Sequence, residues 1–594
     1  MNKKNTLKLH LLFYTIISCG LLNAQVITPL PQKTGITTPI PVYIPRITGY
    51  VDMHTHPMSH LAFGGKIMYG TPDLTTLGLA GSFYAGFDVF KKECNTVNET
   101  AGNLEKALGN CNAMHGGAGA DNDCGNYIRA EIVNSVDKVY RFKQKNGVGD
   151  LGHMDHPHGG YPNFISWPDQ SGVSHQQMWY EWIQRAFRGG LKIMVALAVN
   201  NSLLAKAAGA DQFIDDKSSV ELQLIEMKKF VNNHSDFMEI AKTPADALRI
   251  VRANKLAVVL GVETDDIGNL TRRSKIDKET ININQVRAEL QNLYTNFDVR
   301  YIFPIHFSDN VFGGTAVNDP LFALSTKYYT NNYVSVRESI GEDISYKHHK
   351  ENFDFIRNNA LKMQNLGWVI EGQPEYTAPT NPAAGHANVK GLGPLGSTGI
   401  LEMMKMGMMI DIDHMSQRSM TATLALSHLL GKYPLNAGHT GIRPVVGGNE
   451  RNLYRPFVDS IIKLGGMIGV GTSNSNPDAF IAAFNDIYRQ SNGSLNIAFG
   501  TDANGMEPLP KCTPGLNSAD FYNGFSLPKS TLGNKTWDYT QTGMAHYGLL
   551  PEFIKDVRER PNGTLVANTL NSSADRFILM WEKCERLSAT LRAR

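Results

Sequence analysis

Residues 408–439 read MMIDIDHMSQRSMTATLALSHLLGKYPLNAGH, and this stretch decides the fold. It opens with a short apolar run at Met408–Ile412, continues with an amphipathic segment at Ser416–Leu430, and closes with a second apolar run at Leu435–Ala437. A strand, a helix and a strand in this order predict two parallel strands joined by a right-handed crossover. The fold class therefore depends on how often the chain repeats this unit.

The same alternation extends outward from this stretch in both directions. The chain contains eight short apolar runs, which are Tyr50–Met53, Lys192–Val199, Ala257–Val262, Tyr301–Ile305, Met408–Ile412, Leu435–Ala437, Gly466–Val470 and Ile497–Phe499. Amphipathic segments predict helices at 220–232, 244–254, 284–296, 350–365, 398–406, 416–430, 455–464 and 477–489, with a further helical region at 551–587 outside the strands. Eight strand–helix units favour a closed (β/α)₈ barrel of the TIM type over an open sheet.

Histidine and acidic side chains end six of the eight runs. They are His54, His56, Glu263, His306, His414, His439 and Asp502. The carboxyl ends of barrel strands form the face that carries active sites, so these side chains are expected to lie near one another. Any one of them alone is more often a satisfied polar residue than a metal ligand. The six strand ends taken together favour a metal site.

The chemistry of this set points to two divalent ions. His54 and His56 are two positions apart on a strand, so both point to one side and can share one ion. A carboxylate can bridge two cations, and Glu263 is placed to do so. Imidazole and carboxylate ligands suit zinc or a similar first-row ion. The sequence therefore predicts a two-metal centre at the barrel mouth, with zinc as the expected metal.

The same segments resemble the membrane (renal-type) dipeptidases of the amidohydrolase superfamily. Residues 407–471, with MMIDIDHMSQRSM, YPLNAGHTGIRPVVGGNERNLYRP and LGGMIGVG, are similar to the region of that family from its fifth to its seventh strand. VVLGVET, VRYIFPIHFSDN and IAFGTDANG resemble its other strands that carry site residues. The resemblance covers most of 250–510 and the C-terminal helices, and little of 57–180.

The resemblance implies a ligand set for each ion. Glu263 bridges the two zinc ions, His54 and Asp502 lie at one of them, and His414 and His439 complete the shell of the other. These assignments come from the resemblance and not from spacing. They predict the same centre that the strand ends predict.

The resemblance also implies the catalytic and substrate-binding residues. Asp502 handles the proton of the bridging water, and His306 steadies the oxyanion of the tetrahedral intermediate. Arg451, in Glu450-Arg451-Asn452, binds the free carboxylate of the substrate. These roles predict hydrolysis of an amide bond in a dipeptide or an N-acyl amino acid. A hydrolase of cyclic amides, lactones or phosphoesters, and a non-catalytic surface binding protein on the same barrel, are the alternatives.

One position departs from the family. The first motif of the family is His-x-Asp, whereas this chain has His54-Thr55-His56, the His-x-His of most other amidohydrolases. His56 can still bind a metal, but a neutral ligand replaces an anion. The centre then carries one less negative charge, which should make its water more acidic and hold the metals less tightly.

The N-terminus is expected to direct export. Residues 1–24 combine basic Lys3, Lys4 and Lys8 with the short apolar run Leu11–Leu22, which predicts a signal peptide cut after Ala24. The segment around Cys19 also resembles a bacterial lipobox, which would anchor the protein to a membrane through a lipid. We therefore expect a periplasmic or extracellular protein, and membrane attachment only if Cys19 is lipidated.

Other parts of the chain are less regular. Residues 25–49 predict an extended arm, and 50–587 the hydrolase barrel, with 57–180 as an irregular insertion over its mouth. The insertion holds the tract His153, His156 and His158, which is weak evidence for a site. The pair His348-His349, between two lysines, is interpreted as part of a solvated surface.

Composition sets broad limits on partners. The net charge of +2, without a long basic run after the first residues, argues against a nucleic-acid partner and leaves a small molecule as the expected one. An exported protein can form disulfides, but the sequence leaves their pairing open among Cys94, Cys111, Cys124, Cys512 and Cys584. The oligomeric state is also open, a homodimer included.

Overall fold

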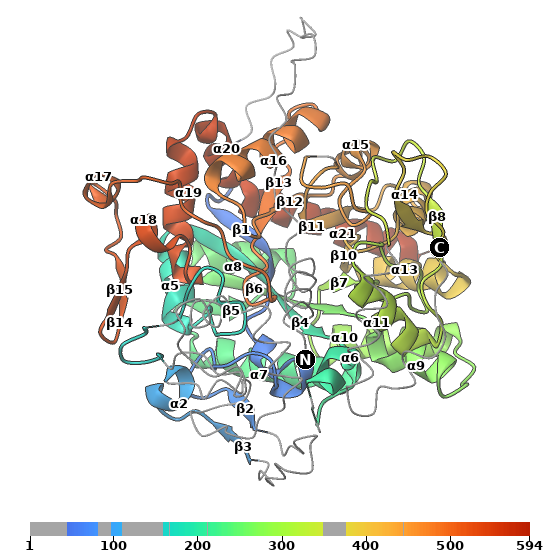
Figure 1. Ribbon diagram of the computed structural model, residues 1–594, viewed down its shortest axis with the longest axis horizontal. Coiled ribbons are helices and arrows are strands. Elements are labelled where there is room, and N and C mark those ends of the chain that lie inside the picture. The colour runs from blue at the N-terminus through green and yellow to red at the C-terminus, as the bar shows by residue number, and fades with distance from the viewer. Residues whose placement is uncertain are drawn as a thin grey trace, which may run out of the picture.

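The computed structural model describes residues 44–80, 97–109, 159–165, 167–208, 210, 212–348, 376–443 and 445–593. These residues form a barrel of parallel strands in the interior with helices around it (Figure 1). The predicted fold class, a (β/α)₈ barrel, is confirmed.

Eight strands make the closed ring. In order around it they are β4 (Leu191–Asn200), β1 (Tyr50–Thr55), β13 (Ile497–Gly500), β12 (Ile468–Gly471), β11 (Leu435–Thr440), β10 (Met409–Asp411), β7 (Tyr301–Phe303) and β6 (Leu256–Thr264). A long parallel pairing of β4 with β6, from Ile193 opposite Ala257 to Asn200 opposite Thr264, closes the ring. Each ring strand coincides with one of the predicted apolar runs. A ninth strand, β5 (Met238–Ile240), adds to the start of β6.

Helices connect successive ring strands. The main ones are α5 (Tyr180–Arg188), α7 (Asp216–Asn233), α8 (Pro244–Arg252), α10 (Ile283–Thr295), α13 (Pro394–Met406), α14 (Gln417–Leu429), α15 (Arg455–Lys463) and α16 (Pro477–Gln490). Their starts follow from local sequence. Asn282 and Gln285 form a capping box at α10, and Asn476 caps α16, whose first residue is Pro477. The predicted helix at 350–365 lies outside the described residues.

Shorter elements complete the described chain. They are α2 (Leu104–Leu108), α6 (Ser202–Ala207), α9 (Leu270–Lys275), α11 (Pro320–Thr330), α17 (Ser518–Tyr522), α18 (Tyr539–Thr542), β2 (Leu77–Ala80), β3 (Val97–Thr100), β8 (Val336–Glu338), β9 (His386–Asn388), β14 (Ser530–Leu532) and β15 (Lys535–Trp537). The predicted helical region at 551–587 consists of α19 (Leu550–Glu559), α20 (Gly563–Leu570) and α21 (Ser573–Arg592).

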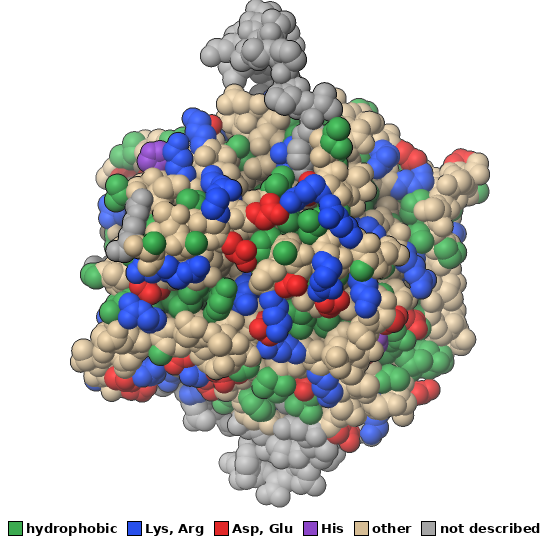
Figure 2. Space-filling view, turned by 180° about the vertical axis from the view of Figure 1, so that it is seen from behind, with side chains coloured by type: hydrophobic (Ala, Val, Ile, Leu, Met, Phe, Trp, Pro, Cys, Tyr) green, Lys and Arg blue, Asp and Glu red, His purple; other side chains and the backbone are tan. Residues whose placement is uncertain are grey.

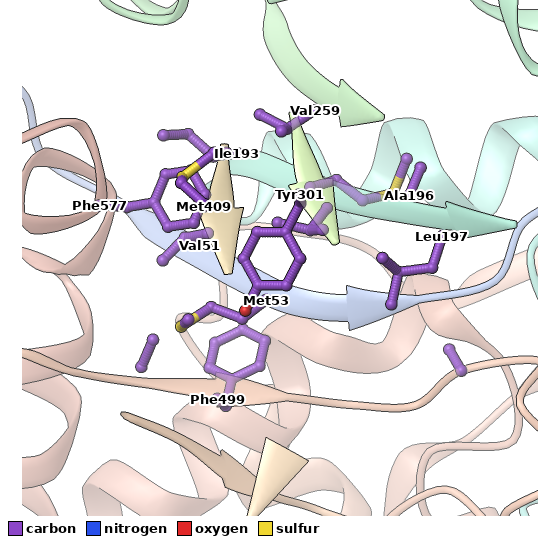
Figure 3. Packing of buried hydrophobic residues seen from close by; sticks show 14 of the residues in the cluster. Val51, Met53, Ile193, Ala196, Leu197, Val259, Tyr301, Met409, Phe499 and Phe577 are labelled. Carbon is purple, nitrogen blue, oxygen red and sulfur yellow. The ribbon is translucent and has the colours of Figure 1, made fainter. Parts of the chain in front are cut away.

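The barrel interior is filled by large apolar side chains from many strands. Figure 3 shows Val51 and Met53 of β1, Tyr301 of β7 and Phe499 of β13 pointing toward one another, and each is fully buried. Phe577 of α21 joins this cluster and stacks on Tyr301 with ring centroids 6.4 Å apart. The last helix thus packs against the amino ends of the strands and leaves the carboxyl ends free for chemistry.

The segment between β1 and α5 corresponds to the predicted insertion. Its described residues form the two-stranded sheet of β2 and β3, the helix α2 and irregular backbone. Hydrogen bonds join it to the carboxyl ends of ring strands, and two of them are made by backbone N–H groups. The backbone N–H of Phe63 donates to Asn200 Oδ1 at 2.8 Å, and that of Gln177 donates to Asn504 Oδ1 at 3.0 Å. Whether the insertion covers the mouth stays a prediction, and His153, His156 and His158 lie outside the described residues.

The interpretation of the pair His348-His349 as a solvated surface is wrong for His348, and His349 lies outside the described residues. His348 is 5% exposed, so it is not part of a solvated surface. Its backbone N–H donates to His386 Nδ1 at 2.8 Å, and its ring stacks on Tyr376. Tyr376, which is distant in sequence, covers the ring of His348, and the flanking lysines do not reveal this contact.

The surface carries both charges. On the face in Figure 2, basic and acidic side chains are interspersed, in keeping with the net charge of +2. Every helix among the described residues is too short or too polar to span a bilayer. Cys512 and Cys584 are free thiols, and Cys94, Cys111 and Cys124 lie outside the described residues.

Candidate metal centre

The seven strand-end residues of the sequence analysis meet at the carboxyl end of the barrel. His54 lies in β1 and Glu263 in β6, while His56 directly follows β1. His439 lies in β11, and His306, His414 and Asp502 come shortly after β7, β10 and β13. All are buried except Asp502, whose side chain is 13% exposed. Parallel strands thus bring together side chains that are more than 400 residues apart in the chain.

Glu263 stands at the middle of the group, and its two oxygens face different histidines. Oε2 lies 3.0 Å from His54 Nε2 and 3.3 Å from His56 Nε2. Oε1 lies 3.3 Å from His414 Nε2 and 3.6 Å from His306 Nε2. One carboxylate therefore joins two separate sets of nitrogens, which is the arrangement of a bridging ligand.

Asp502 and His439 complete the two sets. Asp502 Oδ1 lies 3.1 Å from His56 Nε2 and 3.5 Å from His54 Nε2. His439 Nε2 lies 3.0 Å from His414 Nε2. We name the first set the β1 half (His54, His56, Asp502) and the second the β11 half (His414, His439), with Glu263 shared between them.

The donor atoms fit metal ions. Three groups of three residues have their donor atoms within 4.8 Å of one another: His54, His439 and Asp502; His54, His56 and Glu263; and Glu263, His306 and His414. Glu263 Oε1 is buried and has no hydrogen-bond partner among the described residues. A buried carboxylate oxygen without a partner is costly, so a cation facing it would satisfy it.

The protonation states of these side chains also suit metal binding. Burial raises the pKa of a carboxylate, but the charges of His54 and His306 outweigh burial and hold the pKa of Glu263 well below its usual range. Burial, together with the charge of Arg451, lowers the pKa of His414 to about 3, and burial lowers that of His439 well below 6.5. The two rings are therefore neutral, and their Nε2 atoms lie 3.0 Å apart. Ionised carboxylate and neutral imidazole are the forms that bind metals.

His56 behaves differently. Burial alone would lower its pKa, but hydrogen bonds to Asp502 and Glu263 raise it to about 10. Without a cation, His56 thus carries a proton between two carboxylates. A divalent ion at this place would take over the role of that proton.

Backbone strain and supporting carboxylates hold the ligands. His414 and Asp502 have φ of 66° and 54°, a left-handed conformation that is unfavourable for residues with side chains and that clusters at functional sites. Asp413 Oδ2 accepts the backbone N–H of His439 at 2.9 Å and lies 3.2 Å from its Nδ1. Asp52 accepts the backbone N–H of His54 at 3.1 Å. Such contacts orient metal ligands.

Sequence reasoning missed these supporting residues. Asp52 and Asp413 stand two positions and one position before a histidine, but only the structure shows which backbone groups they contact. A third, Asp265, accepts a hydrogen bond from Asn201 Nδ2 at 2.7 Å and lies 3.7 Å from His306 Nδ1. An acidic residue one or two positions before a histidine, as in Asp413-His414 and Asp52-Met53-His54, is the signal that could have found the first two.

Arg451 lies at the β11 half. Its Nη2 donates to the backbone oxygen of His439 at 3.5 Å, and its charge lowers the pKa of both His414 and His439. The side chain is partly exposed. A guanidinium at the open edge of the centre is suited to bind an anionic group of a substrate.

The comparisons with known proteins agree with this chemistry. Residues 357–523 match the family model of membrane dipeptidases (peptidase family M19), and this segment contains His414, His439, Arg451 and Asp502. The predicted resemblance to that family is thereby confirmed for this part of the chain.

Solved structures are similar at low identity. One is an amidohydrolase from Pseudomonas aeruginosa, with 13% identity, a TM-score of 0.39, and coverage of 68% of this chain and 92% of the other. A metallo peptidase from Rhodobacter sphaeroides, liganded with a phosphinate mimic of the dipeptide L-Ala-D-Ala, has 13% identity, a TM-score of 0.40 and coverage of 68% and 89%. The probable dipeptidase PvdM from Pseudomonas aeruginosa has 12% identity, a TM-score of 0.38 and coverage of 68% and 88%.

Proposed function

We propose that this relative of the membrane dipeptidases, a metal-dependent hydrolase, cleaves the amide bond of dipeptides or N-acyl amino acids at a centre of two divalent ions, with zinc as the expected metal. The observation that carries the proposal is the position of Glu263. Its Oε2 faces His54 and His56, and its Oε1 faces His414. A carboxylate divided in this way between two sets of imidazoles supports two ions and not one.

Each half of the centre would bind one of the two ions. His54, His56 and Asp502 would hold one ion, His414 and His439 the other, and Glu263 both. When bound, a pair of divalent ions lowers the pKa of a water between them to near neutrality and polarises the substrate carbonyl. The rest of the chemistry falls to side chains of this chain.

Asp502 is the proposed proton carrier. It is the one carboxylate of the set that reaches the open side, with 13% of its side chain exposed. His56 and His54 hold its pKa below the ordinary value against the effect of burial, so the carboxylate is in the ionised form that a proton acceptor requires. It would take the proton from the attacking water and give it to the leaving amine.

His306 and Arg451 are proposed to bind the two oxygen groups of the substrate. His306 Nε2 lies 3.6 Å from Glu263 Oε1, on the same side of the centre as His414. From there an N–H of its ring would donate to the oxyanion that forms in the transition state, a contribution of about 3 kcal/mol in comparable sites. Arg451 would bind the C-terminal carboxylate through its planar pair of N–H groups.

We also propose that the protein acts outside the cytoplasm, on the strength of residues 1–24. Fractionation of cells that express the full chain tests this proposal. Recovery of the protein with residue 25 at its N-terminus supports the cut after Ala24. Recovery in the membrane fraction, lost in Cys19→Ser, would support lipidation, and an uncut cytoplasmic protein would contradict export.

A substrate panel tests the activity. Purified protein reconstituted with zinc or with manganese is assayed on dipeptides, N-acyl amino acids, cyclic amides, lactones and phosphoesters, with and without chelator. The proposal expects cleavage of the first two classes, loss of activity with chelator, and two ions per chain by elemental analysis. Substantially less than one ion per chain, or no cleavage of either class by the loaded protein, would refute it.

A further inference from the structure

Glu507 is a carboxylate at the centre that the proposed mechanism does not use. It lies in the loop that follows Asp502 and is close enough to both Asp502 and Arg451 to interact with them electrostatically. No ion pair within 4.0 Å joins it to a basic side chain of the described residues. Arg451 and Glu507 are thus opposite charges at one site that do not neutralise each other directly.

The carboxylate of Glu507 is only half satisfied. Ser473 Oγ donates to its Oε2 at 2.6 Å, and Oε1 has no hydrogen bond with any described residue. Burial, and after it the charge of Asp502, raises the pKa of Glu507 to about 7, and the hydrogen bond from Ser473 and the charge of Arg451 offset this only in part. One oxygen is therefore held in place and the other is free to accept a hydrogen bond.

The loop that carries Glu507 lies against the β1 half. A Cβ atom on Gly505 would lie 1.8 Å from Asp502 Oδ1 and 2.9 Å from His56 Cδ2, so the loop backbone lies directly against these two ligands. Arg451, by contrast, contacts His439 of the β11 half. The loop that carries Glu507 and the side chain of Arg451 therefore contact opposite halves of the centre, and Ser473, just after β12, holds the Glu507 carboxylate.

We propose that Glu507 binds the free α-amino group of the substrate, and that the centre therefore prefers zwitterionic dipeptides to N-acyl amino acids. The inference rests on the proposed function, because Arg451 is taken to bind the other end of the same molecule. Two residues of extended chain span about 7 Å, so the two charges of a dipeptide lie on either side of its amide bond. With the ends at Glu507 and Arg451, the amide lies over the metal ligands.

The charges at the centre explain why a carboxylate is needed beside the amino group of the substrate. An ammonium group brought close to two divalent cations is repelled by them, and a carboxylate beside it offsets this repulsion. His56 adds no negative charge to the β1 half, and Asp502 is engaged as a ligand. Glu507 supplies the missing anion in the loop that covers these two residues.

A matched pair of substrates isolates the effect. Alanyl-alanine and N-propionyl-alanine differ only in the amino group, and zinc-loaded protein is assayed on both. We expect wild-type protein to prefer alanyl-alanine. We expect Glu507→Gln to raise KM for alanyl-alanine about 10-fold to 100-fold, the loss typical of a charge-assisted hydrogen bond. KM for N-propionyl-alanine should change less than about twofold, because that substrate has no group for Glu507 to bind.

Two control variants make the result specific. Glu559→Gln changes an exposed carboxylate at the end of α19 and should leave both substrates unaffected. Glu507→Asp keeps the charge and should restore part of the preference. Metal content and Tm of each variant show whether the centre and the fold are intact.

Each result has one meaning. An equal loss on both substrates, or no change in Glu507→Gln while the wild type is active, would overturn this inference and leave the proposed function standing. Absence of cleavage of both substrates by wild-type loaded protein would overturn the proposed function, and this inference with it.

Discussion

His414 Nε2 and His439 Nε2 lie 3.0 Å apart, although the two residues follow or belong to different strands. The left-handed backbone of His414, with φ of 66°, aims its ring at the end of β11. Burial keeps both rings neutral, and a neutral imidazole can offer a ring nitrogen to a cation, so the two Nε2 atoms can bind one ion between them.

This contact predicts that the two histidines bind one ion together. His414→Ala and His439→Ala should each reduce the bound metal from two ions to about one per chain and lower kcat/KM by at least about 100-fold, because loss of an outer-shell contact alone costs about 10-fold to 100-fold. Elemental analysis and steady-state kinetics measure both. His428→Ala, at an exposed position of α14, should keep both ions. Retention of two ions in His414→Ala would contradict the ligand assignment.

His56→Asp is predicted to tighten metal binding. The substitution replaces a neutral ligand by an anion next to Glu263 and Asp502, and a more negative ligand set holds cations more strongly. It should also make the water of the centre less acidic, so the acidic limb of the pH profile of kcat/KM should move up by about one pH unit. Competition with a chelator and pH–rate curves measure the two effects. His56→Asn keeps the neutral charge, and if it shifts the curve equally the explanation by charge is wrong.

Arg451→Ala is predicted to impair binding of substrates with a free C-terminus. Loss of a charge-assisted, bidentate contact should raise KM about 10-fold to 100-fold with a smaller change in kcat. Dipeptide amides, which lack the carboxylate, should bind equally to both proteins. Arg451→Lys should recover only part of the loss because an ammonium cannot bind both oxygens in one plane. A change of the same size on amides would assign Arg451 a structural role.

Asp319→Asn is predicted to stabilise the protein at neutral pH. Asp319 is 5% exposed and caps α11 by accepting the backbone N–H of Leu321 at 2.7 Å. Burial raises its pKa to about 7. Since the unfolded chain ionises near pH 3.8 and the folded one near pH 7, wild-type protein loses stability as the pH rises between these values. Asparagine caps equally well without ionising.

The gain from Asp319→Asn should therefore be small at pH 4 and reach about 4 kcal/mol above pH 7. Tm or urea unfolding at several pH values measures it. Asp459→Asn, on the exposed side of α15, serves as control. A gain that is equal at pH 4 and pH 8 would show that Asp319 does not titrate as described.

The sequence predicted the ring of strands because parallel strands are buried on both faces and read as continuous apolar runs. Met408–Ile412 and Ala257–Val262 are of this kind, and both are ring strands. The convergence of strand-end residues followed from the geometry of the barrel alone. The roles of these residues as ligands, acid–base group and substrate contacts stay predictions.

What depends on tertiary contacts could not be predicted. The burial of His348 depends on Tyr376, and the support of His439 on a backbone hydrogen bond to Asp413. No role could be predicted for Glu507 from the sequence. Its position depends on Gly505, whose lack of a side chain lets the loop lie against Asp502. Such contacts leave no period or spacing in a sequence.

The link between β1 and α21 has a consequence for how the protein is made. The backbone N–H of Gly49 donates to the oxygen of Asn571, that of Val51 donates to Ser573 Oγ, and Phe577 fills the end of the ring beside Val51. A ribosome-bound chain that has not yet released residue 577 cannot close this end. The amino end of the barrel is therefore closed only by a segment that is synthesised after all eight ring strands, so the ring cannot be sealed while its last strand is still the newest part of the chain.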